Sequence, residues 1–217
     1  MHTEDDEAHR RHAELGFDEA SWEERYRIAP TLWSGRANPQ LVAEAAGLPP
    51  GRALDAGSGE GGDALWLAGR GWRVTAADFS TVALARAAAA AERLDPEVAG
   101  RVEWVHADLT RWEPPAGAFD LVSAQYLHLP SHDRDPAFAR LAAAVAPGGS
   151  LLVVGHRPSE LHTGMPEMFF SAQQVAATLD PEAWDVVVCE TRPRTASGPA
   201  GRELPVADTV LRARRRA

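Results

Sequence analysis

A glycine-rich segment at residues 53–62 carries the strongest sign of chemistry in this sequence. An apolar stretch, Arg52–Ala56, runs into glycines at alternate positions, and a helix-like segment follows. Glycines let the backbone turn sharply and approach a ligand without a clash at Cβ. Gly57, Gly59 and Gly62 also have the G-x-G-x-x-G spacing of sites at which a helix N-terminus faces a pyrophosphate. The segment predicts a ligand-binding loop, but the spacing alone does not decide the ligand.

The carboxylate of Asp55, just before the first glycine, distinguishes two kinds of ligand. Beside the ligand it would repel a pyrophosphate, whereas it could hold a cationic ammonium group. An amino-acid ligand such as S-adenosylmethionine has an ammonium group, and a nicotinamide dinucleotide presents two phosphates there. Asp55 therefore favours a ligand with an amino-acid end.

Two more carboxylates follow predicted strands. Asp78 ends the second strand, 19 residues after Gly59, which is the usual place for an acid that accepts hydrogen bonds from ribose hydroxyls. Asp108 follows the third strand and could accept a hydrogen bond from the exocyclic amine of adenine. Each alone could be an ordinary turn or cap aspartate. Three acids at the ends of three consecutive strands favour a ligand site, because ligands bind at the carboxyl ends of such strands.

Three side chains could act as bases or hydrogen-bonding groups beyond the later strands. Tyr126 and His128 follow the fourth predicted strand, and His156 follows the fifth. An imidazole with an ordinary pKa of about 6.5 suits base catalysis at neutral pH. Either histidine could instead be a loop residue bonded to the backbone. Cys189 is the only cysteine, which excludes a cysteine-rich zinc site, and no other metal site is predicted.

The positioning elements alternate along the chain. The predicted strands are Arg52–Ala56, Trp72–Ala77, Val102–His106, Phe119–Ala124, Ser150–Gly155, Trp184–Glu190 and Val206–Arg212. The predicted helices are Phe17–Ile28, Leu41–Ala46, Asp63–Gly69, Thr81–Leu94 capped by Ser80, Pro136–Val145 and Ala172–Leu179. This order predicts an α/β fold with a doubly wound, mostly parallel sheet covered on both faces. The last two strands are expected to form an antiparallel pair joined by a loop at Thr191–Glu203.

Length and charge limit the class of protein. A chain of 217 residues suits one domain, predicted over residues 17–217, after a flexible N-terminal segment at residues 1–16. The formal charge of −9 disfavours nucleic acid as a partner. No apolar stretch is long enough for a membrane span, and the acidic start lacks the features of a signal peptide, so we expect a cytoplasmic protein. The oligomeric state is not predicted.

Together these motifs resemble those of class I S-adenosylmethionine-dependent methyltransferases. The family's motifs match Leu54–Gly61, Asp78 in Ala77–Ser80, Asp108, Phe119–Val122 and Ala146–Gly149. The resemblance implies a Rossmann-like sheet of seven strands with an antiparallel last strand, and S-adenosylmethionine as the cofactor. The residues expected to contact the cofactor are Asp55, Gly57, Ser58, Gly59, Glu60, Gly61, Asp78, Phe79, Asp108, Leu109, Gln125 and Trp33.

The front of the chain suggests a branch of this family. Trp22–Tyr26 followed by Leu32–Gly35 is similar to the start of thiopurine- and tellurite-resistance-type methyltransferases. By this resemblance Trp33 lies against the methionine end of the cofactor, although it could equally be a core anchor. Ser34 departs from the Trp-Asp-x-Gly pattern of that branch.

The predicted function is in-line methyl transfer to a small-molecule nucleophile through sulfur, oxygen, nitrogen or another chalcogen. His156 and His128 are the candidate bases. Enzymes that methylate exocyclic amines of nucleic acids carry Asn/Asp-Pro-Pro-aromatic after the fourth strand, where this chain has Ser123–Tyr126. Two alternatives stay open: a nicotinamide-dependent oxidoreductase, and a non-catalytic module that binds S-adenosylmethionine.

Overall fold

The computed structural model describes residues 16, 18–157, 166–197 and 203–217. Most of the segment predicted to be flexible, residues 1–16, lies outside these residues.

A mixed sheet of seven strands forms the centre of the fold, in the order β3-β2-β1-β4-β5-β7-β6. The strands β1 to β5 pair in parallel, and β7 is antiparallel to both of its neighbours, β5 and β6. The predicted fold class is therefore confirmed. The strands are β1 (Arg52–Ala56), β2 (Arg73–Asp78), β3 (Val102–His106), β4 (Phe119–Gln125), β5 (Val145–His156), β6 (Trp184–Ser197) and β7 (Glu203–Arg215).

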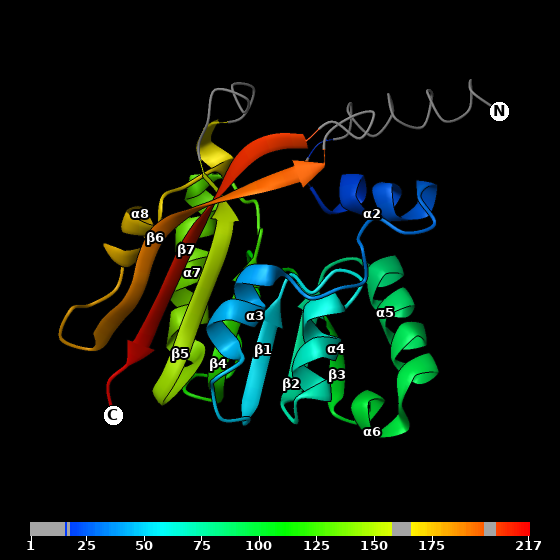
Figure 1. Ribbon diagram of the computed structural model, residues 1–217, viewed down its shortest axis with the longest axis horizontal. Coiled ribbons are helices and arrows are strands. Elements are labelled where there is room, and N and C mark those ends of the chain that lie inside the picture. Colours follow the sequence, from blue (N-terminus) through cyan, green and yellow to red (C-terminus); the bar gives the residue numbers. More distant parts are fainter. Residues whose placement is uncertain (1–15, 17, 158–165, 198–202) are drawn as a thin grey trace.

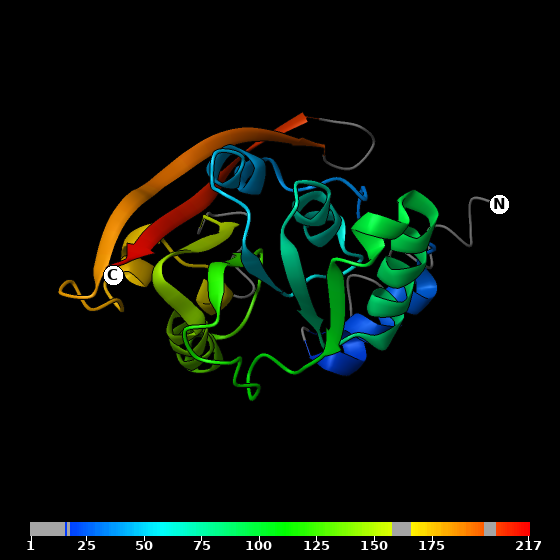
Figure 2. The same cartoon turned by 90° about the horizontal axis from the view of Figure 1, so that it is seen from below.

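Helices cover both faces of the sheet, as Figure 2 shows for α3 and α4 on one face and α7 on the other. The helices are α2 (Glu19–Ile28), α3 (Pro39–Ala45), α4 (Gly62–Gly69), α5 (Thr81–Leu94), α6 (Pro96–Ala99), α7 (Ser131–Ala144), α8 (Ala172–Ala176) and the 3-10 turn η2 (Pro166–Met168). Asp18 and Ser80 cap α2 and α5 by accepting hydrogen bonds from the Ser21 and Ala83 amides.

Alternation along the strands divides the core between the two faces. Ala53 of β1 packs with α3 and α4, whereas Leu54 packs with α7 and α8. Leu151 and Leu152 of β5 divide in the same way. Both faces are apolar, which is why these strands have continuous apolar sequences.

Two predicted boundaries near β5 are wrong. The helix predicted at Pro136–Val145 begins at Ser131, and Pro136 lies inside it. Pro136 lacks an N–H and leaves only the carbonyl four residues earlier without its helical partner. The strand predicted at Ser150–Gly155 extends back to Val145 and includes the Pro147–Gly149 turn, because Val145 pairs with Phe119 across an irregular register.

The loop predicted at Thr191–Glu203 is also wrong over most of its described residues. Residues 191–197 continue β6, and Glu203 begins β7. Pro193 is tolerated because β6 is an edge strand, on which a missing N–H need not break a ladder. The part of β7 before Asp208 pairs with β6 only, so this end of the hairpin extends beyond β5. Figure 1 shows it at the edge toward which the parallel strands point, on the side of α2.

Candidate active site

The turn after β1 has a backbone that only glycine accommodates easily. Gly59 has φ +51°, and a Cβ there would lie 3.0 Å from the Tyr26 hydroxyl and 3.4 Å from Trp33 Nε1. Gly61 has φ +81°, and a Cβ there would lie 2.7 Å from Trp104. Residues 57–61 therefore form a glycine loop that packs between Tyr26 and Trp33 on one side and Trp104 of β3 on the other.

Two buried oxygen atoms, one just before this loop and one within it, have no hydrogen-bond partner among the described residues: Asp55 Oδ2 and Ser58 Oγ. Asp55 lies within β1 rather than at its end, and its side chain is 1% exposed. Burial, followed by the charges of Asp63 and Asp78, raises the pKa of Asp55 well above its ordinary value. Polar atoms buried without a partner are costly, so both atoms suit a site that a ligand completes.

Asp78 connects β2 to the glycine loop. Its Oδ2 accepts a hydrogen bond from the Gly59 amide at 2.8 Å, and its Oδ1 accepts one from the Ser80 amide at 2.8 Å. Burial raises the pKa of Asp78, while these two hydrogen bonds oppose the rise. A carboxylate oxygen can accept a second hydrogen bond, so Asp78 keeps acceptor capacity for a ribose hydroxyl. Phe79 is half-buried, and its carbonyl oxygen lies 2.9 Å from His106 Nε2.

Glu60 binds the segment that precedes α3. Its Oε2 accepts hydrogen bonds from the Leu32 and Trp33 amides at 3.1 and 3.0 Å, and its Oε1 pairs with Arg86 at 3.0 Å. Trp33 is 53% exposed, and its Nε1 donates to the Tyr26 hydroxyl at 3.1 Å. Trp33 thus lies beside Gly59 of the glycine loop and is more than half exposed, so it is not a core anchor.

Asp108 and Leu109 lie in the turn after β3. Asp108 Oδ1 accepts hydrogen bonds from the Thr110 amide and hydroxyl at 2.9 and 2.6 Å. Leu109 is buried in the core, and Arg140 of α7 donates to its carbonyl oxygen at 3.1 Å. The Ala107 amide donates to the Asp78 carbonyl at 2.9 Å, so this turn adjoins the end of β2.

The end of β4 brings a second group of residues to the glycine loop. Gln125 is buried, and its Nε2 donates to Ser123 Oγ at 3.0 Å. Tyr126 has φ 54° and is the one non-glycine residue with positive φ in the described part of the chain. Such strain is concentrated at functional sites. The next residue, Leu127, lies 3.4 Å from where a Cβ of Gly57 would be.

Aromatic and imidazole rings gather beyond β4 and β5. The Tyr126 and His156 rings have centroids 4.6 Å apart, and His128 stacks on His156 at 5.2 Å. Phe169, which follows η2, lies 5.5 Å from His128 and joins this group of rings.

Asp208 of β7 completes this group, and the sequence interpretation did not single it out. Its side chain is fully buried, with Arg194 Nε 2.9 Å from both carboxylate oxygens and Gln40 Nε2 at 3.1 Å. Burial alone would raise the pKa of Asp208, but the neighbouring His156, Arg194, Gln40 and Tyr126 side chains outweigh it and lower the pKa to about 2. The signal in the sequence that could have revealed Asp208 is an acidic residue within an otherwise apolar predicted strand. Arg194 lies in the segment Thr191–Glu203, which was wrongly predicted to be a loop.

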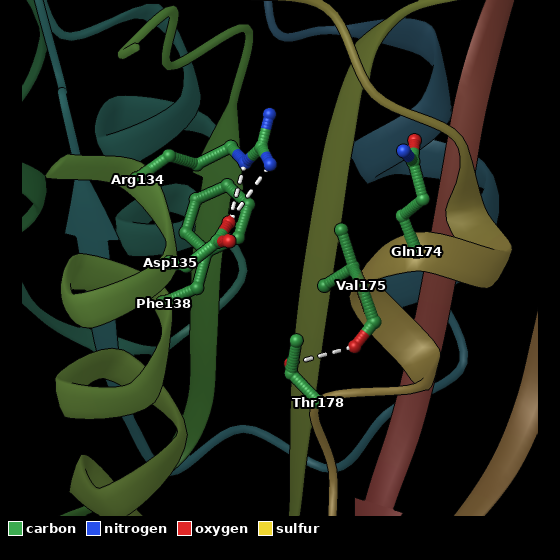
Figure 3. Close-up of a pocket in the computed structure, with 6 residues that line it drawn as sticks. All are labelled: Arg134, Asp135, Phe138, Gln174, Val175 and Thr178. Carbon is green, nitrogen blue, oxygen red and sulfur yellow. Dashed lines mark hydrogen bonds and ion pairs between the residues drawn. The ribbon is translucent and has the colours of Figure 1, made fainter. Parts of the chain in front are cut away.

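A separate cavity of about 230 Å³ lies between α7 and α8 (Figure 3). It is lined by Arg134, Asp135, Phe138, Gln174, Val175 and Thr178. Arg134 pairs with Asp135 at 2.8 Å, and none of the predicted site residues lines this cavity. It is therefore not the candidate site.

Within the described ranges, no group of three or more His, Cys, Asp or Glu residues could hold a metal ion. None of the helices in this part of the chain is long and apolar enough to cross a membrane.

Residues 53–149 match the family described as methyltransferase domain. A stretch of 112 residues is 34% identical to uncharacterized methyltransferases of Mycobacterium tuberculosis and Mycobacterium bovis, covering 52% of this chain and 54% of each relative. The chain thus spans about half the length of the curated relatives it matches.

Solved structures share the fold over most of the chain. A protein from work on the conversion of a disulfide bond into a thioacetal group during echinomycin biosynthesis has a TM-score of 0.72 at 24% identity, covering 91% of this chain and 92% of its own. A SAM-dependent methyltransferase from Methanosarcina mazei has a TM-score of 0.63 at 17% identity, covering 83% and 99%. TehB from Haemophilus influenzae has a TM-score of 0.66 at 15% identity, covering 90% and 66%.

The glycine loop, with its buried unpartnered oxygens and the acid at the end of β2, fits a ligand with a ribose and an amino-acid end. Residues 53–149 are thus similar to methyltransferase domains, and the chain shares its fold with a solved SAM-dependent methyltransferase.

Proposed function

We propose that this chain transfers the methyl group of S-adenosylmethionine to a small-molecule nucleophile by in-line displacement. The observation that carries the proposal is the contact between two surfaces, which we call the cofactor half-site and the acceptor half-site. The glycine loop offers the cofactor surface, and the rings of Tyr126, His128 and His156 form a second surface, joined to the loop where Leu127 meets Gly57. A methyl donor and its acceptor need such adjoining surfaces.

The first half-site supplies the cofactor contacts. We assign the ribose to Asp78, the ammonium end to Asp55, the adenine amine to Asp108 and the cover to Trp33. The backbone of Gly57–Gly61 and the side chains of Phe79, Leu109 and Gln125 complete the surface. When bound, S-adenosylmethionine supplies a methyl group activated by its sulfonium and a sulfide leaving group.

The chain's own contribution is position and proton removal. Holding the reacting atoms in near-attack geometry is worth roughly 7–11 kcal/mol. His156 is the proposed base and His128 the second candidate, since both rings belong to the same stack. Burial and the neighbouring Asp208 carboxylate raise the pKa of Tyr126, so this phenol stays protonated and is not the base.

We further propose a sulfur or other chalcogen acceptor. The similarity of the front end to thiopurine- and tellurite-resistance-type methyltransferases supports it. So does the likeness to the protein linked to disulfide-to-thioacetal conversion. The net charge of −9 supports a small molecule over a nucleic acid.

The cofactor assignment is tested by thermal shift. S-adenosylhomocysteine should raise the melting temperature, and NADH and NADPH should leave it unchanged, because the site offers an acid where a dinucleotide has phosphates. Stabilisation by the nucleotides alone would make the chain an oxidoreductase. Release of S-adenosylhomocysteine with a panel of thiols, phenols and amines distinguishes an enzyme from a binding module.

Asp78→Ala refines the same test. It should weaken S-adenosylhomocysteine binding by about 1.5–3 kcal/mol, the range for hydrogen bonds to a charged group. Asp120→Ala is the matched control, because Asp120 also accepts a backbone N–H, from Arg52 at 2.8 Å, at the opposite end of the sheet. If calorimetry shows that Asp78→Ala binds S-adenosylhomocysteine with unchanged affinity, Asp78 does not contact the ribose.

A further inference from the structure

Asp208 lies directly opposite His156 in the antiparallel ladder between β5 and β7. The nearest carboxylate oxygen is 3.8 Å from His156 Nδ1, an ion-pair distance. Asp208 is fully buried, whereas the His156 side chain is 32% exposed. One edge of the imidazole thus faces a buried carboxylate while part of the ring remains open to solvent.

We propose that Asp208 is a positioning residue that keeps the proton of His156 on Nδ1, so that the Nε2 lone pair takes a proton from the methyl acceptor. This inference rests on the proposed function. It also names the acceptor class: a nucleophile that enters protonated, as a thiol, selenol or phenol does, and must lose that proton during the reaction.

The chemistry of Asp208 supports this tautomer. Arg194 Nε lies 2.9 Å from both oxygens of Asp208 and favours its ionised form, which can only accept hydrogen bonds, so a hydrogen on the ring nitrogen that faces this carboxylate is favoured. Nδ1 is that nitrogen. Catalytic hydrogen bonds are often long before ligands bind, which agrees with the 3.8 Å separation.

The other groups around the His156 ring indicate that Asp208 acts by orienting the imidazole rather than by stabilising a positive charge on it. His156 is faced by Tyr126 and His128 beyond β4, and Arg194 of β6 reaches Asp208 beside it. Since Arg194 already offsets the charge of Asp208, little net charge is left for His156. What remains is the direction of the carboxylate lone pairs, which selects the tautomer.

The proton transfer balances within these groups. The bond between hydrogen and the acceptor atom breaks, and the acceptor atom keeps the electron pair with which it attacks the methyl carbon. The bond between that carbon and the sulfonium sulfur breaks, and its electron pair stays on the sulfur, which leaves as a neutral thioether. The proton forms a bond to Nε2, which makes an imidazolium between Asp208 and the acceptor site. Solvent takes the proton from the exposed side of the ring afterwards.

The test is nuclear magnetic resonance of the ¹⁵N-labelled full chain at about pH 8.5, where an ordinary imidazole is neutral. Comparison with His156→Gln assigns the resonances of this ring. In the wild type, Nδ1 should show the shift of a protonated nitrogen and Nε2 that of a nitrogen with a lone pair. Asp208→Asn should move the ring toward the other tautomer, because an amide can donate to Nδ1 as well as accept from it. Gln40→Leu, which removes another hydrogen bond to Asp208, should leave the tautomer unchanged.

Ligands test the direction of Nε2. Sinefungin carries an amine where the transferring methyl group would be, and it should shift the Nε2 resonance more than S-adenosylhomocysteine does. A wild-type proton on Nε2, or a tautomer unaltered in folded Asp208→Asn, would overturn the role of Asp208. Equal Nε2 shifts with both ligands bound would overturn His156 as the base. If calorimetry shows that neither ligand binds, the proposed function fails instead. The wild-type spectrum decides the tautomer even if Asp208→Asn does not fold.

Discussion

Asp55, Asp63 and Asp78 form a buried group of carboxyls around the start of α4. Asp63 accepts hydrogen bonds from the Asn38 amide and side chain at 2.6 and 2.8 Å, and Asp78 accepts two from backbone amides. Asp55 accepts from the Ala64 amide, but its Oδ2 has no partner among the described residues. Of the three carboxyls, Asp55 is therefore the one whose ionised form a bound ammonium group would stabilise most.

The raised pKa of Asp55 has a defined effect on stability. Above pH 3.8, the ordinary value, an unfolded Asp55 loses its proton while the folded one keeps it. The folded state then binds more protons, so the contribution of Asp55 to the free energy of unfolding falls as pH rises from about 3.8 toward the raised pKa.

We predict that Asp55→Asn separates stability from binding. Because the amide has no charge to bury, the variant should gain stability relative to the wild type as pH rises above about 4. It should lose more affinity for S-adenosylhomocysteine than for adenosine, which lacks the amino-acid end. Denaturation at several pH values and calorimetry with both ligands measure this. Equal losses for the two ligands would mean that Asp55 only supports the turn.

At the scale of elements, α2 and the segment after it are fastened to the domain by side chains rather than by a large apolar face. Arg86 donates to the Tyr26 carbonyl and to Glu60, and Glu23 accepts from Ser80 and Thr81. These polar contacts hold Trp33 over the glycine loop. An element held in this way is one that a few substitutions can release.

We predict that Glu60→Ala releases this segment. Hydrogen exchange of the Leu32 and Trp33 amides should accelerate, and S-adenosylhomocysteine should bind about tenfold or more weakly, since hydrogen bonds to charged groups are worth about 1.5–3 kcal/mol. Glu24→Ala is the control, because its exposed pair with Arg27 at 3.2 Å contributes little. If exchange accelerates while affinity is kept, Trp33 does not cover the cofactor.

At the scale of the whole molecule, the β6–β7 hairpin and α3 are joined by buried charge. Glu44 of α3 pairs with Arg212 at 3.0 Å and with Arg192, while Gln40 reaches both Arg192 and Asp208. Figure 2 shows the hairpin curving past α3. The acceptor half-site is therefore assembled from distant parts of the chain.

We predict that Asp208→Asn destabilises the protein in a pH-dependent way. A folded pKa of about 2 against an ordinary 3.8 means that the stabilisation is complete above 3.8 and is lost as pH falls toward 2. The variant should lose roughly 2 kcal/mol at pH 7, and the difference should shrink between about pH 4 and pH 2. Urea denaturation at several pH values measures it. The control is Asp185→Asn, which removes an exposed pair with Arg216 on the same hairpin. A loss that does not depend on pH would contradict the ionised state of Asp208.

The sequence by itself determined the glycine loop, the parallel sheet, the antiparallel last strand and the acid at the end of β2. These follow from local rules. A positive φ strongly favours glycine, the period of the apolar residues marks the strands, and turn residues mark where the strands end. Only the tertiary structure decided that Pro193 continues an edge strand, that Glu60 holds Trp33, and that Asp208 faces His156. Asp208, Arg194 and Gln40 meet because of the register between β5, β7 and β6 and the packing of α3. No local pattern encodes such a meeting, since it depends on residues up to 168 positions apart.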